Sequence, residues 1–232
     1  MLTGQNSAWA IDGDRRNRAS VARFKRLPSP DGSQIAFMDV SSDTPWKIRL
    51  VPATGGSAEV IVQGETDVVD PTWTPNGKVV VFSKSRANGG IYRLDLNSKK
   101  ISQVPNSDGL FSPRLSPDGR YISAPTVSMS ELKLFDTTTK RWSSLAEGVQ
   151  LMFNEWSRDG KYIYFRGNQR GAAKLWRVRI VDRGLEEILN LKDFPQRSDV
   201  SSLWLGLALD DAPLLMRDRS VQEIYALELQ FP

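Results

Sequence analysis

The sequence predicts an all-β protein, a β-propeller of four-stranded antiparallel blades in which five repeats are recognised. Three observations predict it. A tight turn that ends in glycine recurs every 41 to 45 residues, the same apolar offsets follow each turn, and no stretch shows sustained helical periodicity.

The turn has four complete copies and one degenerate copy. The complete copies are Ser-Pro-Asp-Gly at 29–32, Thr-Pro-Asn-Gly at 74–77, Ser-Pro-Asp-Gly at 116–119 and Ser-Arg-Asp-Gly at 157–160. Their glycines are 45, 42 and 41 residues apart, and Leu-Asp-Asp-Ala at 209–212 follows after 51 more. Proline presets φ at the first corner, Asp or Asn tolerates the left-handed region, and glycine adopts positive φ without strain. Each copy therefore predicts a hairpin, and the recurring Asp or Asn is explained by the turn itself.

A strand with one buried face is expected directly after each turn. Three residues past the glycine the chain has Ile35, Val80, Ile122 and Ile163, and five residues past it Phe37, Phe82, Ala124 and Phe165. This period of two is typical of a half-buried strand.

The remaining strands of each repeat follow from the same alignment. A third strand is predicted at 48–51, 91–94, 132–135, 175–178 and 224–227, and short fourth strands at 60–62 and 187–189. First strands precede the turns at 70–73, 112–115 and 154–156. Four short strands in 40 to 45 residues make one propeller blade, and blades stack radially because none can bury both faces alone.

The domain prediction is a propeller over residues 22–232, preceded by an N-terminal segment at 1–21. Residues 8–11 read as a further third strand, whereas the last repeat stops after its own third strand. Residues 8–11 could supply the missing outer strand and close a five-bladed ring, which would protect the sheet edges. Alternatively they are the remnant of a sixth blade in an incomplete six-bladed ring. Both alternatives remain open.

Residues 71–96 carry a nameable pattern: Pro-Thr-Trp-Thr-Pro-Asn-Gly, then Val-Val-Phe, then Ile-Tyr-Arg-Leu-Asp. It resembles the WD-like propeller repeat of TolB, over about residues 22–229. The TolB resemblance implies six blades and an extra N-terminal domain, whereas only five units are recognised here. The tail at 213–218 and 222–227 resembles the C-terminal propeller of bacterial, acidobacterial-type signalling proteins with a winged-helix or Ser/Thr-kinase module. That resemblance implies binding and scaffolding.

Composition argues against several functions. The chain has no cysteine and no histidine, so Ser-His-Asp and Cys-His catalysis cannot be built from its own residues. It has no Gly-x-Ser-x-Gly elbow, and its net charge of +4 is scattered, which predicts no nucleic-acid partner. No apolar run reaches the roughly 20 residues of a membrane span, and no signal peptide is recognised. Location stays open: cytoplasmic as written, or periplasmic if the chain ends a membrane-anchored regulator.

We therefore predict a soluble, non-enzymatic protein-interaction or sensing propeller with a protein partner and without catalytic residues, a metal site or a cofactor. The alternatives are a small-ligand or carbohydrate binder that uses the central channel, and a propeller hydrolase or lyase. Exposed Trp and Arg are frequent at interface hot spots. The candidate partner-binding residues are Trp46, Arg86, Asn88, Arg114, Asn168, Arg170 and Trp204.

Overall fold

The computed structural model describes residues 27–41, 43–84, 89–169, 171–194 and 205–215, and these contain eighteen strands and no helix. Four sheets have four strands each and a fifth has two, which confirms an all-β propeller. The first blade comprises β1 (Leu27–Pro28), β2 (Gln34–Asp39), β3 (Lys47–Pro52) and β4 (Glu59–Val62). The second comprises β5 (Val68–Trp73), β6 (Val79–Lys84), β7 (Ile91–Asp95) and β8 (Ile101–Gln103).

The later sheets follow the same order. The third blade comprises β9 (Arg114–Leu115), β10 (Tyr121–Pro125), β11 (Glu131–Asp136) and β12 (Arg141–Glu147). The fourth comprises β13 (Gln150–Trp156), β14 (Tyr162–Gln169), β15 (Ala172–Arg179) and β16 (Leu185–Asn190). The fifth sheet contains β17 (Leu205–Leu207) and β18 (Pro213–Leu215). Every neighbouring pair is antiparallel, as expected for strands joined by hairpins.

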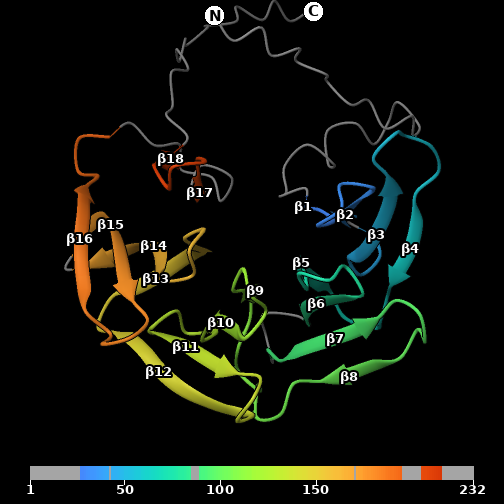
Figure 1. The fold of residues 1–232 in the computed structure, drawn as a ribbon, viewed down its shortest axis with the longest axis horizontal. Coiled ribbons are helices and arrows are strands. Elements are labelled where there is room, and N and C mark those ends of the chain that lie inside the picture. Colours follow the sequence, from blue (N-terminus) through green and yellow to red (C-terminus); the bar gives the residue numbers. More distant parts are fainter. Residues whose placement is uncertain (1–26, 42, 85–88, 170, 195–204, 216–232) are drawn as a thin grey trace, which may run out of the picture.

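The sheets radiate from a common centre along an arc (Figure 1). The first strands β5, β9 and β13 lie toward the centre, and the fourth strands β8, β12 and β16 lie on the outside. The structure does not give a clear count of five blades, because the fifth sheet has only two described strands. The predicted third strand at 224–227 and the N-terminal segment 1–21 lie outside the described residues.

Each complete turn is closed by the same side-chain hydrogen bonds. The Ser157 hydroxyl donates to Asp159 Oδ1 at 2.8 Å and accepts the N–H of Tyr162 at 2.9 Å. The other three turns repeat both contacts, with Ser29, Thr74 and Ser116 as the hydroxyl residues. The Asp or Asn oxygen also accepts a backbone N–H two residues later. These bonds hold the corner, as predicted for the recurring Asp and Asn.

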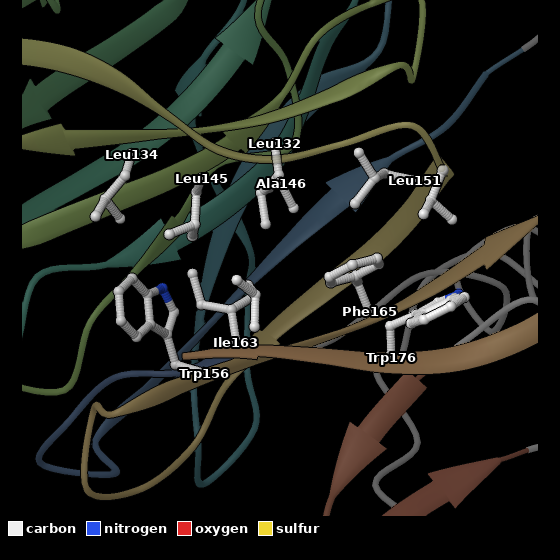
Figure 2. Close-up of a cluster of buried hydrophobic side chains, with 11 residues drawn as sticks. Leu132, Leu134, Leu145, Ala146, Leu151, Trp156, Ile163, Phe165 and Trp176 are labelled. Atoms are coloured by element: carbon white, nitrogen blue, oxygen red, sulfur yellow. The ribbon is translucent and has the colours of Figure 1, made fainter. Parts of the chain in front are cut away.

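The core lies between the blades. Leu132, Leu134 and Leu145 of the third blade pack on Trp156, Ile163 and other apolar side chains of the fourth (Figure 2). Ile163 and Phe165 are fully buried as predicted, but Tyr164 between them is buried too, so β14 is covered on both faces and the prediction of a single buried face was wrong there. Because each interface uses one face from each of two neighbouring sheets, no blade buries its apolar surface by itself.

Candidate functional site

One pocket is lined by equivalent residues from four blades. Leu27, Thr72, Arg114 and Glu155 each lie two residues before the hydroxyl residue of their turn, on the innermost strand. Their ladder partners are also equivalent, four residues after the turn glycine: Ala36, Val81, Ser123 and Tyr164. The pocket, of about 420 Å³, also includes Leu115, Pro117, Trp156, Ser157 and Arg158. We call this site the channel pocket.

Irregular backbone precedes these residues in three blades. Asp70, Ser112 and Phe153 occupy the equivalent position, and all three have positive φ, at 52°, 48° and 50°. The register shifts at the same place in β5 and β13, between Val69 and Thr72 and between Met152 and Asn154. Bulges change the direction of the side chains that follow them and are frequent next to functional sites. The repeated bulge therefore positions the residues of the channel pocket.

A buried polar network supports the bulges. The N–H of Ser112 donates to Ser83 Oγ of the second blade at 3.2 Å. Asn154 of the fourth blade donates to the carbonyl of Ser112 at 3.4 Å and accepts from Ser123 Oγ at 2.7 Å. Buried polar groups of this kind are costly unless they are paired. The network therefore ties three successive blades together beside the axis.

Arg114 is the buried cation of the channel pocket. Its residue exposure is only 6%, and its Nη1 donates to the carbonyl of Pro113 at 2.8 Å. Its Nε is buried without a hydrogen bond and lies 3.6 Å from Glu155 Oε1 of the next blade. Burial lowers the pKa of Arg114, and the nearby Asp70 carboxylate opposes that shift. A guanidinium remains protonated under such a shift, so the pocket holds a fixed positive charge.

Tryptophans fix the innermost strands to one another. Trp156 Nε1 donates to the carbonyl of Arg114 at 3.1 Å, and Trp73 Nε1 donates to the carbonyl of Leu27 at 2.9 Å. Both bonds run from one blade to the channel-pocket residue of the preceding blade. Because buried indole N–H groups need an acceptor, these bonds set the spacing between adjacent blades at the pocket.

The three predicted binding residues that the structure describes do not lie together. Arg114 lies in the innermost strand β9, as expected. The N–H of Trp46 donates to Asp67 Oδ1 at 2.9 Å, and its carbonyl accepts from Val68, where β5 begins. Asn168 pairs with Gln150 and Ala173 at the end of β14 far from the turn. Trp46 and Asn168 are thus at the other end of the blades from Arg114. Arg86, Asn88, Arg170 and Trp204 lie outside the described residues.

The sequence reasoning missed Glu155, Thr72 and Leu27 as neighbours of Arg114. The signal that could have found them is their shared offset from the turn. In the described part of the chain no group of three or more acidic residues is arranged to hold a metal ion. The same residues form no helix that is long and apolar enough to cross a membrane.

No protein-family model matches the chain. The chain is 24% identical over 197 residues to dipeptidyl-peptidase 5 of Porphyromonas gingivalis, a match that covers 73% of this chain and 27% of that protein. It is 29% identical over 179 residues to the uncharacterized peptidase YuxL of Bacillus subtilis, which covers 71% of this chain and 25% of YuxL. The chain thus spans only about a quarter of these relatives.

TolB proteins are similar to this chain in both sequence and structure. A TolB homolog of Chlorobium chlorochromatii is 26% identical over 127 residues, covering 52% of this chain and 28% of that protein. The crystal structure of TolB from Acinetobacter baumannii superposes with a TM-score of 0.64 at 21% identity, covering 72% of this chain and 43% of TolB. The chain has a TolB-like β-propeller fold. The resemblance to kinase or winged-helix signalling proteins is not supported by these relatives and stays a prediction.

The peptidase relatives show that the prediction of a non-enzymatic interaction or sensing propeller was wrong. The prediction relied on the absence of histidine and cysteine from these 232 residues. That absence restricts the chemistry of these residues, but it does not bear on the other three quarters of the proteins that share this propeller.

Proposed function

We propose that this propeller is the polypeptide-binding module of a peptidase-type hydrolase, and that the channel pocket holds the polypeptide. The observation that carries the proposal is the Arg114–Glu155 pair. A buried guanidinium with an unbonded Nε lies beside a half-buried carboxylate from the next blade, and both line the pocket. A polypeptide offers carbonyl acceptors to the first group and N–H donors to the second.

The relatives support the same class of ligand. Those named as peptidases act on polypeptides, and their similarity to this chain covers 71% and 73% of it. Apolar side chains of Leu27, Leu115 and Trp156 line the pocket around its charged groups, which suits a ligand with both side chains and a polar backbone. In this proposal the propeller selects and orients the polypeptide, and the groups that cleave it lie outside the channel pocket.

A second candidate is docking of a protein partner, which the TolB relatives favour. Both candidates place a polypeptide in the channel pocket, at the turn end of the blades. Trp46 and Asn168, at the opposite end of the blades, form a separate candidate face for such a partner. We also propose that β17 and β18 belong to a fifth blade, since they form an antiparallel hairpin whose turn carries Asp211 in the position of the turn glycine, with a pairing register one residue different from that of the other blades.

Binding of a fluorescein-labelled pool of unstructured twelve-residue peptides, measured by anisotropy, tests the proposal. Arg114→Met removes the guanidinium donor to the peptide carbonyls and should weaken peptide binding about tenfold. The matched control is Arg120→Met, because Arg120 is an exposed arginine of the same blade paired with Asp136 outside the pocket. Equal affinity of the two variants would contradict the proposal.

Hydrolysis of a fluorogenic peptide pool by the protein isolated from its natural cells separates the two candidates. A peptidase-type hydrolase should cleave the pool, and Arg114→Met should raise KM more than it lowers kcat, because Arg114 acts in binding. Peptide binding without cleavage would favour partner docking.

A further inference from the structure

The charges around Arg114 restrict what the channel pocket can accept. Two carboxylates already act on this one guanidinium: Glu155 at 3.6 Å, and Asp70, which supports its charged form. A ligand carboxylate would bring a third negative group beside a single desolvated cation. A ligand carboxylate is therefore disfavoured beside this cation, whereas an uncharged ligand adds no charge to the cluster.

The hydrogen-bonding capacity points to a ligand that both accepts and donates. Nη1 of Arg114 is occupied by the carbonyl of Pro113, while Nε has no hydrogen bond. The Glu155 carboxylate lies just beyond hydrogen-bond distance of Nε, and oxygens of a carboxylate accept several hydrogen bonds. Side-chain exposure is 8% for Arg114 and 20% for Glu155, so a ligand meets Glu155 first and the guanidinium behind it.

An extended polypeptide residue fits this pair. In an extended chain the N–H and C=O of one residue point to the same side, as they do in the hydrogen-bonded pairs of antiparallel sheets. A donor and an acceptor a few ångströms apart can therefore engage one residue at both groups.

We infer that Arg114 and Glu155 together bind one uncharged backbone unit of an extended polypeptide: Arg114 donates to its carbonyl and Glu155 accepts its N–H. The site then recognises the main chain rather than a C-terminal carboxylate or an acidic side chain. This inference rests on the proposed function, because it takes a polypeptide as the ligand of the channel pocket.

Three versions of one peptide test the inference. The probes are a fluorescein-labelled octapeptide of alternating valine and threonine with acetyl and amide caps, the same peptide with a free carboxylate, and a set of capped peptides with one N-methyl group at each position in turn. The capped peptide should bind at least as tightly as the free acid. One N-methyl position should weaken binding about tenfold, because it removes the N–H that Glu155 accepts.

Variants assign the effect to the pair. Glu155→Gln keeps a carbonyl acceptor and should retain most of the affinity for the capped peptide, whereas Glu155→Leu should lose about tenfold and should no longer distinguish the N-methyl peptide. The N-methyl series is measured on the unaltered protein, so it remains decisive if a variant fails to fold.

The outcomes separate the two claims. If the free acid binds tenfold more tightly than the capped peptide, or if no N-methyl position matters, recognition of an uncharged backbone is overturned while polypeptide binding stands. If none of the peptides binds, the proposed function fails, and the inference fails with it.

Discussion

The backbone N–H of Arg158 donates to Asp211 Oδ1 at 3.0 Å and joins the turn of the fourth blade to the turn of the fifth sheet. Arg158 occupies the position that is Pro30, Pro75 or Pro117 in the other turns, and Asp211 occupies that of the turn glycine, with φ of 62°. Only a residue other than proline can donate this bond. Arg158 in place of proline and Asp211 in place of glycine therefore pair with each other.

The other seams between turns are apolar. A methyl group added at Gly77 or Gly160 would lie 3.7 Å or 3.6 Å from the proline Cδ of the preceding turn, and at Gly119 only 3.0 Å from Pro75 Cδ. The turn glycines of the second, third and fourth blades thus lie against the proline of the blade before them. This contact gives the turn proline and the turn glycine a shared role at the boundary between adjacent turns.

We expect Arg158→Pro and Asp211→Gly to be coupled. Either change alone removes the hydrogen bond, at a cost of about 1 kcal/mol, whereas the double variant recreates a proline–glycine seam. Urea unfolding of the four proteins gives the coupling energy. Strict additivity of the two changes would show that the residues act independently.

Substitution of Gly119 by alanine should destabilise the protein by about 2 kcal/mol, since the residue has φ of 73° and its new methyl group would press on Pro75. Gly109 is a matched control, because it has the same φ of 73° and nothing within 4 Å of an added methyl group. Gly109→Ala should show the backbone cost alone, about 1 kcal/mol. The difference between the two losses in unfolding free energy measures the cost of the contact with Pro75. Equal losses would rule out a contribution from that contact.

Replacement of Trp156 by phenylalanine removes the indole donor to the carbonyl of Arg114 while it keeps an aromatic ring. We expect a loss of about 1 kcal/mol in stability and weaker peptide binding, because Trp156 lines the channel pocket. Trp73→Phe is the control: it breaks the equivalent bond to Leu27, but Trp73 itself does not line the pocket. A similar loss of peptide affinity in both variants would contradict a local effect of Trp156.

Acid should weaken the turns of the first and fourth blades. The hydrogen bond from the Ser29 hydroxyl lowers the pKa of Asp31 to about 2, and the bond from the N–H of Lys161 lowers that of Asp159 to about 2. Because the folded pKa lies below the ordinary value of 3.8, this stabilisation is complete above about pH 4 and is lost as the pH falls toward 2.

The control for this pH dependence is present in the chain itself. Asn76 holds the equivalent turn of the second blade with an oxygen that does not titrate. Asp31→Asn and Asp159→Asn should therefore keep the turns and reduce the change in the urea unfolding midpoint between pH 4 and pH 2. An unchanged slope in the double variant would mean that other carboxyl groups cause the acid sensitivity.

Much of the fold was predictable because it depends on local chemistry. The turn sequence and the period of two after it specify β2, β6, β10 and β14 from a few adjacent residues. The positive φ at Asp70, Ser112 and Phe153 was not predicted, since three different residue types adopt it there. That conformation is imposed by contacts with the preceding blade, such as the bond from Ser112 to Ser83, rather than by residue preference.

The sequence by itself determined the repeating unit, since each corner is closed by its own Ser or Thr, Asp or Asn and glycine, and each strand that follows carries its own apolar face. Only the tertiary structure decided that Arg114 meets Glu155, because that contact depends on the angle between two blades and on the positive-φ residues that precede both side chains. Hydrogen bonds inside a turn act over a few residues, whereas the channel pocket exists only after separate sheets have packed around a common axis.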